Sequence, residues 1–177
     1  MRRYSLWLAL VAVAALGLTS VSNWVAIHRP IQHGLAKDPR NEGIRIWGYY
    51  QHGVNWHHVV FDLRDVPRTK SKADVFRTLL QSAQVLKGRR FDSVTLAFRH
   101  RPKFVIPGDY FQKLGEEYDW QNPVYTMRTF PYHLANPDGT PAFEEPLGGW
   151  LYVLGQQMED FGELHDRWYL REMAESQ

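Results

Sequence analysis

Three residues in the first half of the chain have the types and spacing of a metal site: His52, His58 and Asp62. Two histidines and one carboxylate can bind zinc or iron and leave a coordination position open for water or substrate. Asp62 follows His58 by four residues, so both side chains share one face of a strand. A turn at His52-Gly53 would bring His52 opposite them. The pattern therefore predicts a metal-dependent hydrolase site or, alternatively, a surface hairpin with polar side chains facing water.

A group of cations surrounds the predicted start of the first helix. Arg68, Lys70 and Lys72 flank Ser71, a residue type that caps helix N-termini. The free N–H groups of a helix N-terminus, with cations nearby, can hold phosphate or another anion. The spacing matches no known phosphate-binding loop. These four residues predict an anion-binding module, with a solvated basic loop as the alternative.

A third set of residues lies near the C-terminus. Phe161, His165 and Trp168 continue an apolar stripe that starts at Leu151 and recurs every three or four residues. This spacing predicts an amphipathic helix packed on a sheet or on a partner, and we expect the three residues to form a partner-binding seam. Acidic neighbours would let His165 act as an acid or base, although a histidine on such a seam is more often a core residue.

The elements expected to position these residues alternate between strands and helices. Val59, Phe61 and Leu63 alternate with polar residues, which predicts a strand with one side on the core. Strands are expected over 44–50, 55–64, 91–99, 103–106 and 124–130, and helices from Ser71 to Gly88, over 110–118 and over 149–173. The order is β-β-α-β-β-α-β-α. Its hairpins imply a mostly antiparallel sheet, so the predicted fold class is α+β.

The N-terminus predicts a membrane segment. Residues 4–27 carry no charge and follow Arg2 and Arg3. The stretch is long enough for a single transmembrane helix, with Trp7 and Trp24 near the two interfaces. A signal peptide cleaved near residues 20–22 is the alternative. Because the positive flank stays in the cytoplasm, we expect the rest of the chain to be extracytoplasmic, and periplasmic in a bacterium.

The remaining chain divides by composition into two parts. Residues 28–43 lack periodicity and contain two prolines and two glycines, which predicts a linker. Residues 44–177 then form the globular α+β domain. The whole chain has no cysteine, so disulfides and thiolate sites are excluded and packing alone must hold the domain together.

Charge is distributed unevenly along the chain. Residues 28–103 have 15 basic and 6 acidic residues, whereas residues 104–177 have 4 basic and 13 acidic ones. We expect the two halves to interleave in one domain, unless the basic half faces anionic lipid or the acidic half binds a protein partner or a second copy.

The function expected from the sequence is binding or assembly in a cell envelope, by a membrane-anchored domain that is not an enzyme. No catalytic or nucleotide-binding motif is present, and no cofactor is expected. The predicted location argues against a nucleic acid as the partner of the abundant aromatic residues. A protein partner or homo-oligomer is expected instead.

Overall fold

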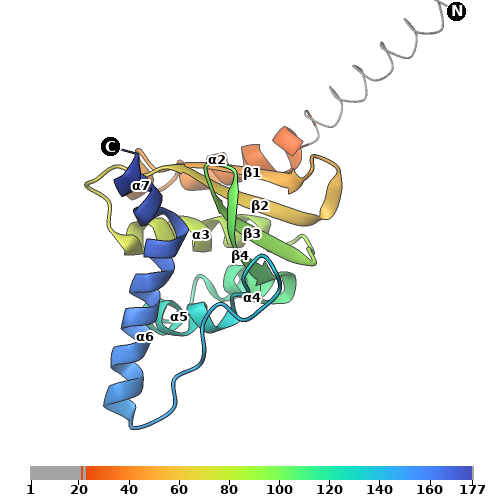
Figure 1. The fold of residues 1–177 in the computed structure, drawn as a ribbon. Helices are drawn as coiled ribbons and strands as arrows, with labels where there is room; N and C mark the ends of the chain where they lie inside the picture. Colours follow the sequence, from red (N-terminus) through yellow and green to blue (C-terminus); the bar gives the residue numbers. More distant parts are fainter. Residues whose placement is uncertain (1–20, 22, 177) are drawn as a thin grey trace, which may run out of the picture.

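The computed structural model describes residue 21 and residues 23–176, whose arrangement is shown in Figure 1. Most of the predicted membrane segment, residues 4–20 and 22, lies outside the described residues. Within the part of the chain that is described, no helix combines the length and apolar character needed to cross a bilayer. The predicted α+β class is confirmed.

Four strands form one sheet in the order β1-β2-β3-β4. They are β1 (Arg45–Gln51), β2 (Asn55–Asp65), β3 (Ser93–Phe98) and β4 (Arg101–Pro107). The two hairpins, β1–β2 and β3–β4, are antiparallel, but the central pair β2–β3 is parallel. This pairing arises because α3 (Lys72–Leu86) connects β2 to β3 and returns the chain to the same end of the sheet. The sheet is therefore mixed rather than simply antiparallel.

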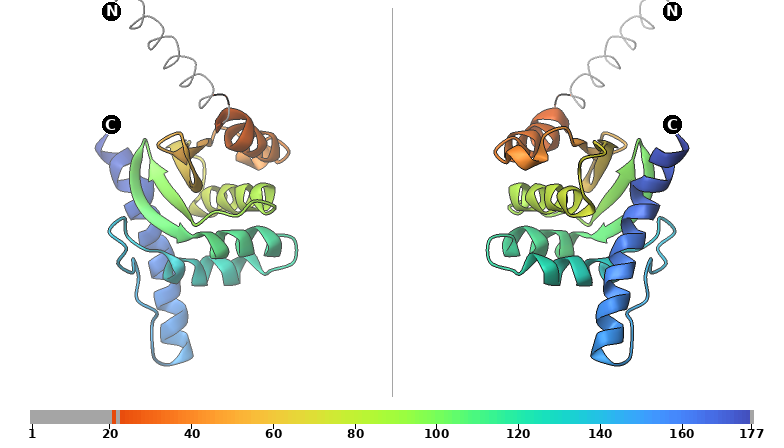
Figure 2. Two further views of the ribbon diagram at one scale, coloured as in Figure 1. Left: turned by 90° about the vertical axis from the view of Figure 1, so that its right-hand side faces the viewer. Right: turned by 90° about the vertical axis from the view of Figure 1, so that its left-hand side faces the viewer.

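Three helices of the described chain cover one face of this sheet. Figure 2 shows α2 (Arg29–Leu35), α3 and α4 (Gly108–Glu117) side by side on that face, with the opposite face open. Between them lies the apolar core, which includes Phe61, Leu79 and Leu96. Ser71 and Asp74 begin α3 with a complete capping box, which fixes where the helix starts.

The predicted fifth strand over residues 124–130 is wrong. The segment forms α5 (Pro123–Thr129) and then the short helix η3 (Phe130–His133). The side chain of Asn122 accepts a hydrogen bond from the amide of Val124, and Pro123 occupies the first turn, where its missing N–H costs nothing. These start signals outweigh the β-branched and aromatic content of the segment. The observed order is β-β-α-β-β followed by helices.

Residues 28–43, expected as a linker, belong to the packed structure. The π-helical turn η1 (Trp24–His28) continues into α2, and η2 (Pro39–Asn41) follows. Ile31 and Leu35 are buried in the core, as is Ile27 before them. Pro30 lies in the first turn of α2 and therefore does not break the helix.

The last helix stands at the end of the sheet where β2 and β3 finish (Figure 1). It runs through α6 (Trp150–His165), the π-helical η4 (Asp166–Leu170) and α7 (Arg171–Glu175). The indole N–H of Trp168 donates to the carbonyl of Ala97 in β3 at 3.0 Å. Trp168 and Tyr169 are buried against the sheet, so this helix closes one end of the core.

Both outer strands of the sheet have partners outside it. At β1, the side chain of Gln32 donates to the carbonyl of Ile46 at 2.7 Å, and the side chain of Asn23 accepts from the amide of Tyr50 at 2.6 Å. At β4, Val105 forms an isolated bridge with Ala135. The helical segment η1–α2 and the segment after η3 thus cover the two sheet edges, which would otherwise present unpaired backbone groups.

Candidate functional site

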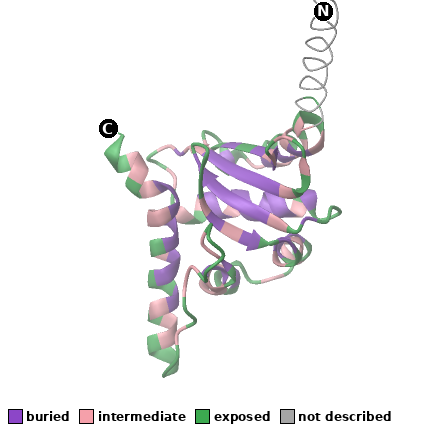
Figure 3. Ribbon diagram, turned by 45° about the vertical axis from the view of Figure 1, so that its right-hand side comes forward, coloured by how far each residue is buried: buried purple, intermediate pink, exposed green. Residues whose placement is uncertain are grey.

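Figure 3 shows that the strands of the sheet are largely buried, and one of these buried residues, Asp62 on the open face, carries a carboxylate. Asp62 of β2 accepts hydrogen bonds on one oxygen from the side chain of Arg64 at 3.0 Å and from the Tyr49 hydroxyl at 3.4 Å, and the Nδ1 of His100 lies 2.9 Å from the same oxygen. Its second oxygen accepts the backbone N–H of His100 at 3.0 Å. Because a buried charge is tolerated only when it is paired and hydrogen-bonded, this network is what allows Asp62 to lie there.

Two of these contacts hold an unusual turn. The β3–β4 hairpin turns at Arg99 and His100, whose φ angles are +47° and +71°. Left-handed backbone at both central positions is typical of a type I′ turn, which favours Asn-Gly and is costly for larger side chains. Asp62 binds both the backbone and the ring of His100. The turn therefore places an imidazole on the open face in a conformation that the network maintains.

Contacts at both ring nitrogens fix the orientation of the His100 imidazole. Its Nδ1 lies 2.9 Å from Asp62 and its Nε2 faces the guanidinium of Arg64. Since Arg64 can only donate, Nε2 is the acceptor in that contact. Burial and the neighbouring carboxylate raise the pKa of Tyr49 to about 12, so its hydroxyl remains a donor at neutral pH.

An aromatic hollow of about 560 Å³ opens beside this network. Trp24, Trp47 and Tyr49 provide its rings, and the other lining residues are Asn23, His28, Gly48, Gly53 and His100. The guanidinium of Arg64 lies 5.2 Å from the centre of the Trp47 ring, in cation–π contact. His28 packs edge-on against the same ring, and partial burial lowers its pKa. The hollow thus combines exposed indoles with fixed polar groups.

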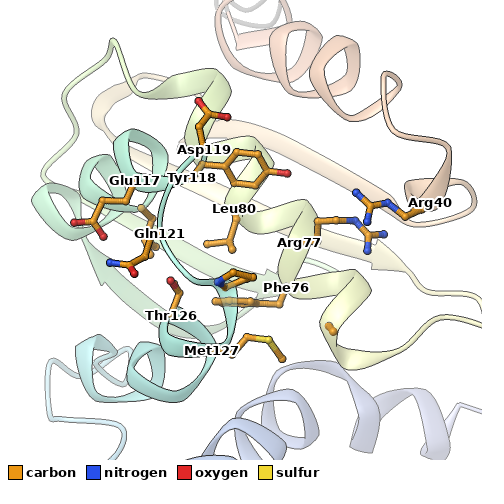
Figure 4. Close-up of a pocket in the computed structure, with 13 residues that line it drawn as sticks. Arg40, Phe76, Arg77, Leu80, Glu117, Tyr118, Asp119, Gln121, Thr126 and Met127 are labelled. Atoms are coloured by element: carbon orange, nitrogen blue, oxygen red, sulfur yellow. The ribbon is translucent and has the colours of Figure 1, made fainter.

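A second pocket, of about 500 Å³, lies between α3, α4 and α5 (Figure 4). Its walls are mainly apolar and include Phe76, Leu80, Leu114 and Met127. At one end, Arg77 pairs with Asp74 at 2.8 Å. Arg40 at the same end is paired with Asp38, which holds the pKa of that carboxyl far below its usual value. Both cations are ion-paired, but the buried Nη2 of Arg77 has no hydrogen-bond partner among the described residues. The pocket therefore combines mainly apolar walls with one unsatisfied donor.

The predicted metal residues do not converge. His52 lies in the β1–β2 turn, with a positive φ of 54°. The Nδ1 of His58 is hydrogen-bonded to the Ser93 hydroxyl at 2.6 Å, and Asp62 is occupied by Arg64 and His100. Among the described residues, no group of three or more acidic or histidine side chains is placed to hold a metal ion.

The predicted anion-binding residues have separate roles. Ser71 and Asp74 satisfy each other at the start of α3. Lys70 donates to the carbonyl of Arg40 at 2.7 Å, and Lys72 binds Asp166 of η4 at 3.1 Å. Arg68 lies in the connection before the helix. The helix N-terminus is thus filled by a carboxylate of the chain itself.

The predicted partner-binding seam packs inside the molecule. Phe161, His165 and Trp168 are all buried. Phe161 packs edge-on against Phe76 of α3, with ring centres 5.3 Å apart. The spacing correctly indicated an apolar helix face, and this face contacts the core of the same chain.

The sequence interpretation missed the residues that gather around Asp62. Tyr49 lies near it through the pairing of β1 with β2, Arg64 because it is two residues along the same strand, and His100 through the turn. The alternation of residues along the strands could have indicated two of them. Tyr49, Asp62 and Arg64 all point to the sheet face opposite to the apolar core residues. His100 carried no such signal, because Arg99-His100 is an uncommon pair for a tight hairpin turn.

Comparison with known proteins gives no relative for this chain: no family model, no curated protein and no solved structure matches it.

Proposed function

We propose that the chain is a membrane-anchored, extracytoplasmic binding domain whose ligand site is the aromatic hollow beside Asp62. The observation that carries this proposal is the meeting of two half-exposed indoles, Trp24 and Trp47, with the Asp62–Arg64–His100 network. A concave site with aromatic walls and a few fixed polar groups is the usual form of a small-ligand site.

Binding is favoured over catalysis because the polar groups of the network already hydrogen-bond one another. Asp62 already accepts hydrogen bonds on both oxygens, and the Nε2 of His100 accepts from Arg64. Neither group offers a free basic site to a substrate proton, as a general base must. The network instead fixes the orientation of His100 and Tyr49, which line the hollow.

The ligand class that fits this arrangement is a sugar ring. A pyranose has apolar C–H faces that pack on indole rings and hydroxyl edges that form hydrogen bonds. Trp24 and Trp47 match the faces, while the Tyr49 hydroxyl and the His100 imidazole, which also line the hollow, match the edges. The site would therefore bind a glycan of the cell envelope.

We base the proposed membrane anchor on the uncharged N-terminal stretch, but we place the C-terminal end of the span earlier than the sequence predicted. Ile27 is buried in the domain core and Asn23 is bonded to the β1–β2 hairpin. Residues 23–27 thus belong to the domain, and the proposed span shortens from 4–27 to 4–22. Nineteen residues rise about 28 Å as a helix, close to the apolar thickness of a bilayer.

A glycan array followed by fluorescence titration would test the site. The full chain in detergent is expected to retain one class of oligosaccharide, and Trp47→Ala to bind it at least tenfold more weakly, since a tryptophan anchor contributes about 2 kcal/mol. Trp120→Ala is the matched control, because Trp120 is exposed in the turn between α4 and α5 and does not line the hollow. Retention of no glycan by the wild type, or equal affinity in Trp47→Ala, would contradict the proposal.

The turn provides a second test that separates function from folding. Arg99→Asn combined with His100→Gly introduces the residues that a type I′ turn prefers. Relief of the left-handed backbone should offset the lost ring contacts, so the melting temperature is expected to stay the same or rise. Glycan affinity should fall, since the imidazole that lines the hollow is gone. Unchanged affinity would mean that His100 serves the turn alone.

A further inference from the structure

The point where the described chain begins is fixed to the tip of the β1–β2 hairpin. The side-chain amide of Asn23 donates to the carbonyl of Gly53 at 2.7 Å and accepts from the amide of Tyr50 at 2.6 Å. Figure 1 shows η1 and this hairpin turn at the same end of the sheet. Whatever surface the N-terminal segment enters must therefore lie close to the hairpin tip.

Four large apolar side chains are exposed at this end of the molecule. Val21 and Val25 lie on the first helical turns, while Val54 and Trp56 lie on the hairpin. Their exposed fractions are 61%, 49%, 60% and 67%, respectively. We call these four residues the apolar rim. Exposed apolar groups gathered beside a predicted membrane segment indicate a surface that leaves water.

Cations lie next to the apolar rim. Lys87, Arg89 and Arg90 are exposed in the turn between α3 and β3. Arg89 donates to the Tyr50 hydroxyl at 3.3 Å, so this turn contacts the end of β1. Asp92 is the acidic residue beside them; its amide is bonded to the carbonyl of His57 in β2. The turn and the hairpin thus form one surface with a net positive charge.

We propose that the apolar rim and the Lys87–Arg90 turn seat the domain on a bilayer that contains anionic lipid. The inference rests on the proposed anchor, which would hold this surface within a few ångströms of the headgroups. Tryptophan favours the membrane interface, and each cation near an anionic leaflet contributes about 1 kcal/mol. An indole, three valines and several cations lie close to the point where the described chain begins. This combination suits an anionic bilayer better than a protein partner, because the core of a protein interface is depleted of lysine.

The absence of cysteine allows a direct test. Val54→Cys in the full chain, labelled with an environment-sensitive fluorophore, is reconstituted into vesicles of neutral lipid with and without phosphatidylglycerol. Lipids that carry a quencher near the headgroup should quench this label, and quench it more when phosphatidylglycerol is present. Leu147→Cys is the matched control, because Leu147 is 87% exposed in the loop before α6, away from the hairpin (Figure 1).

Three outcomes separate the two proposals. Quenching at position 54 but not at position 147 supports the docking surface. Equal, weak quenching at both positions in a chain that floats with the vesicles overturns the docking surface and leaves the anchor intact. A chain that does not float with the vesicles overturns the anchor, and the docking inference with it.

A charge variant tests the role of the anionic lipid. Lys87→Gln combined with Arg90→Gln should abolish at least half of the extra quenching that phosphatidylglycerol causes at position 54. Arg171→Gln, an exposed cation on α7, should leave it unchanged. If phosphatidylglycerol increased the quenching equally in both variants, the Lys87–Arg90 turn would not bind the anionic headgroups.

Discussion

Asp62 and His165 are both fully buried ionisable residues, and the fold treats them in opposite ways. Asp62 is paired with polar groups of Tyr49, Arg64 and His100. His165 lies among the rings of Phe161, Trp168 and Tyr169, and neither of its ring nitrogens has a hydrogen-bond partner among the described residues. Burial, assisted by the charge of Lys72, lowers the pKa of His165 to about 3. This histidine is therefore neutral in the folded protein.

This pKa predicts how stability depends on pH. The unfolded chain binds the proton near pH 6.5 and the folded chain only near pH 3, so acidification through this window favours unfolding. At pH 5 the loss from His165 is about 2 kcal/mol. His165→Phe should remove that loss. Urea unfolding at pH 7.5 and pH 5.0 measures the difference. His57→Gln, at an exposed histidine, is the control and should lose as much stability between pH 7.5 and pH 5.0 as the wild type. If His165→Phe also lost that much stability, the lowered pKa of His165 would be contradicted.

The sequence indicates residue types and faces, but it does not indicate which residues meet. Asp62 was recognised as a candidate ligand, yet the residues that bind it come from β1 and from a turn 38 positions away. His165 was recognised on an apolar seam, but only packing decides that the seam faces the core of the same chain. Such contacts depend on the strand register and on the crossover, which a single sequence does not specify.

At the scale of elements, α3 and α4 cross at a point where no side chain fits. A Cβ on Gly115 of α4 would lie 2.3 Å from the carbonyl oxygen of Ala83 in α3. Gly155, in the middle of α6, has no atom within 4 Å of the equivalent position. Gly115 is therefore required by the close packing of α3 against α4. At Gly155 there is room for a side chain, so a substitution there changes only the helix propensity.

Alanine at these positions should have opposite effects. Gly115→Ala should destabilise the protein by about 1–3 kcal/mol, because the helices must separate. Gly155→Ala should stabilise it by up to about 1 kcal/mol, or roughly 2–4 °C in melting temperature. Thermal unfolding of both variants checks the pair. A stable Gly115→Ala would mean that the crossing tolerates a wider spacing.

Elements with strong local signals could be predicted, and those with conflicting signals could not. The capping box fixed the start of α3, and apolar alternation located β2. The segment 124–130 carried strand-forming residues behind an Asn-Pro helix start, and the start signal prevailed. The segment 28–43 has no clear periodicity, yet Ile31 and Leu35 face the core, because a short helix needs only two apolar positions to pack.

At the scale of the whole molecule, the basic and acidic halves of the chain meet. Lys72 pairs with Asp166, and Glu172 of α7 pairs with Arg101 at 3.4 Å and with Lys103. Lys103 is the main cause of the lowered pKa of Glu172. The charge asymmetry along the sequence is thus partly cancelled in space, where the last helix docks against the sheet.

Removing this contact should weaken docking of the last helix. Glu172→Gln is expected to cost up to about 1 kcal/mol at neutral pH and low salt. The cost should shrink in 1 M salt, where charges are screened, and it should also shrink as the pH falls through the lowered pKa of Glu172, where the wild-type carboxyl loses its charge. Thermal unfolding across these conditions tests it, with Glu159→Gln at an exposed site of α6 as the control. A cost that is independent of salt and pH would point to packing instead.

The hydrogen bonds of Asn23 and Gln32 to β1 make the outer edge of the sheet dependent on residues that precede the strand. Both residues lie after residues 20–22, so a processing cut there would leave the edge covered. A cut downstream of Gln32 would remove η1 and most of α2 and expose the edge of β1. Such an edge can template addition of another chain. The position of a cut would then determine whether β1 is open to strand addition.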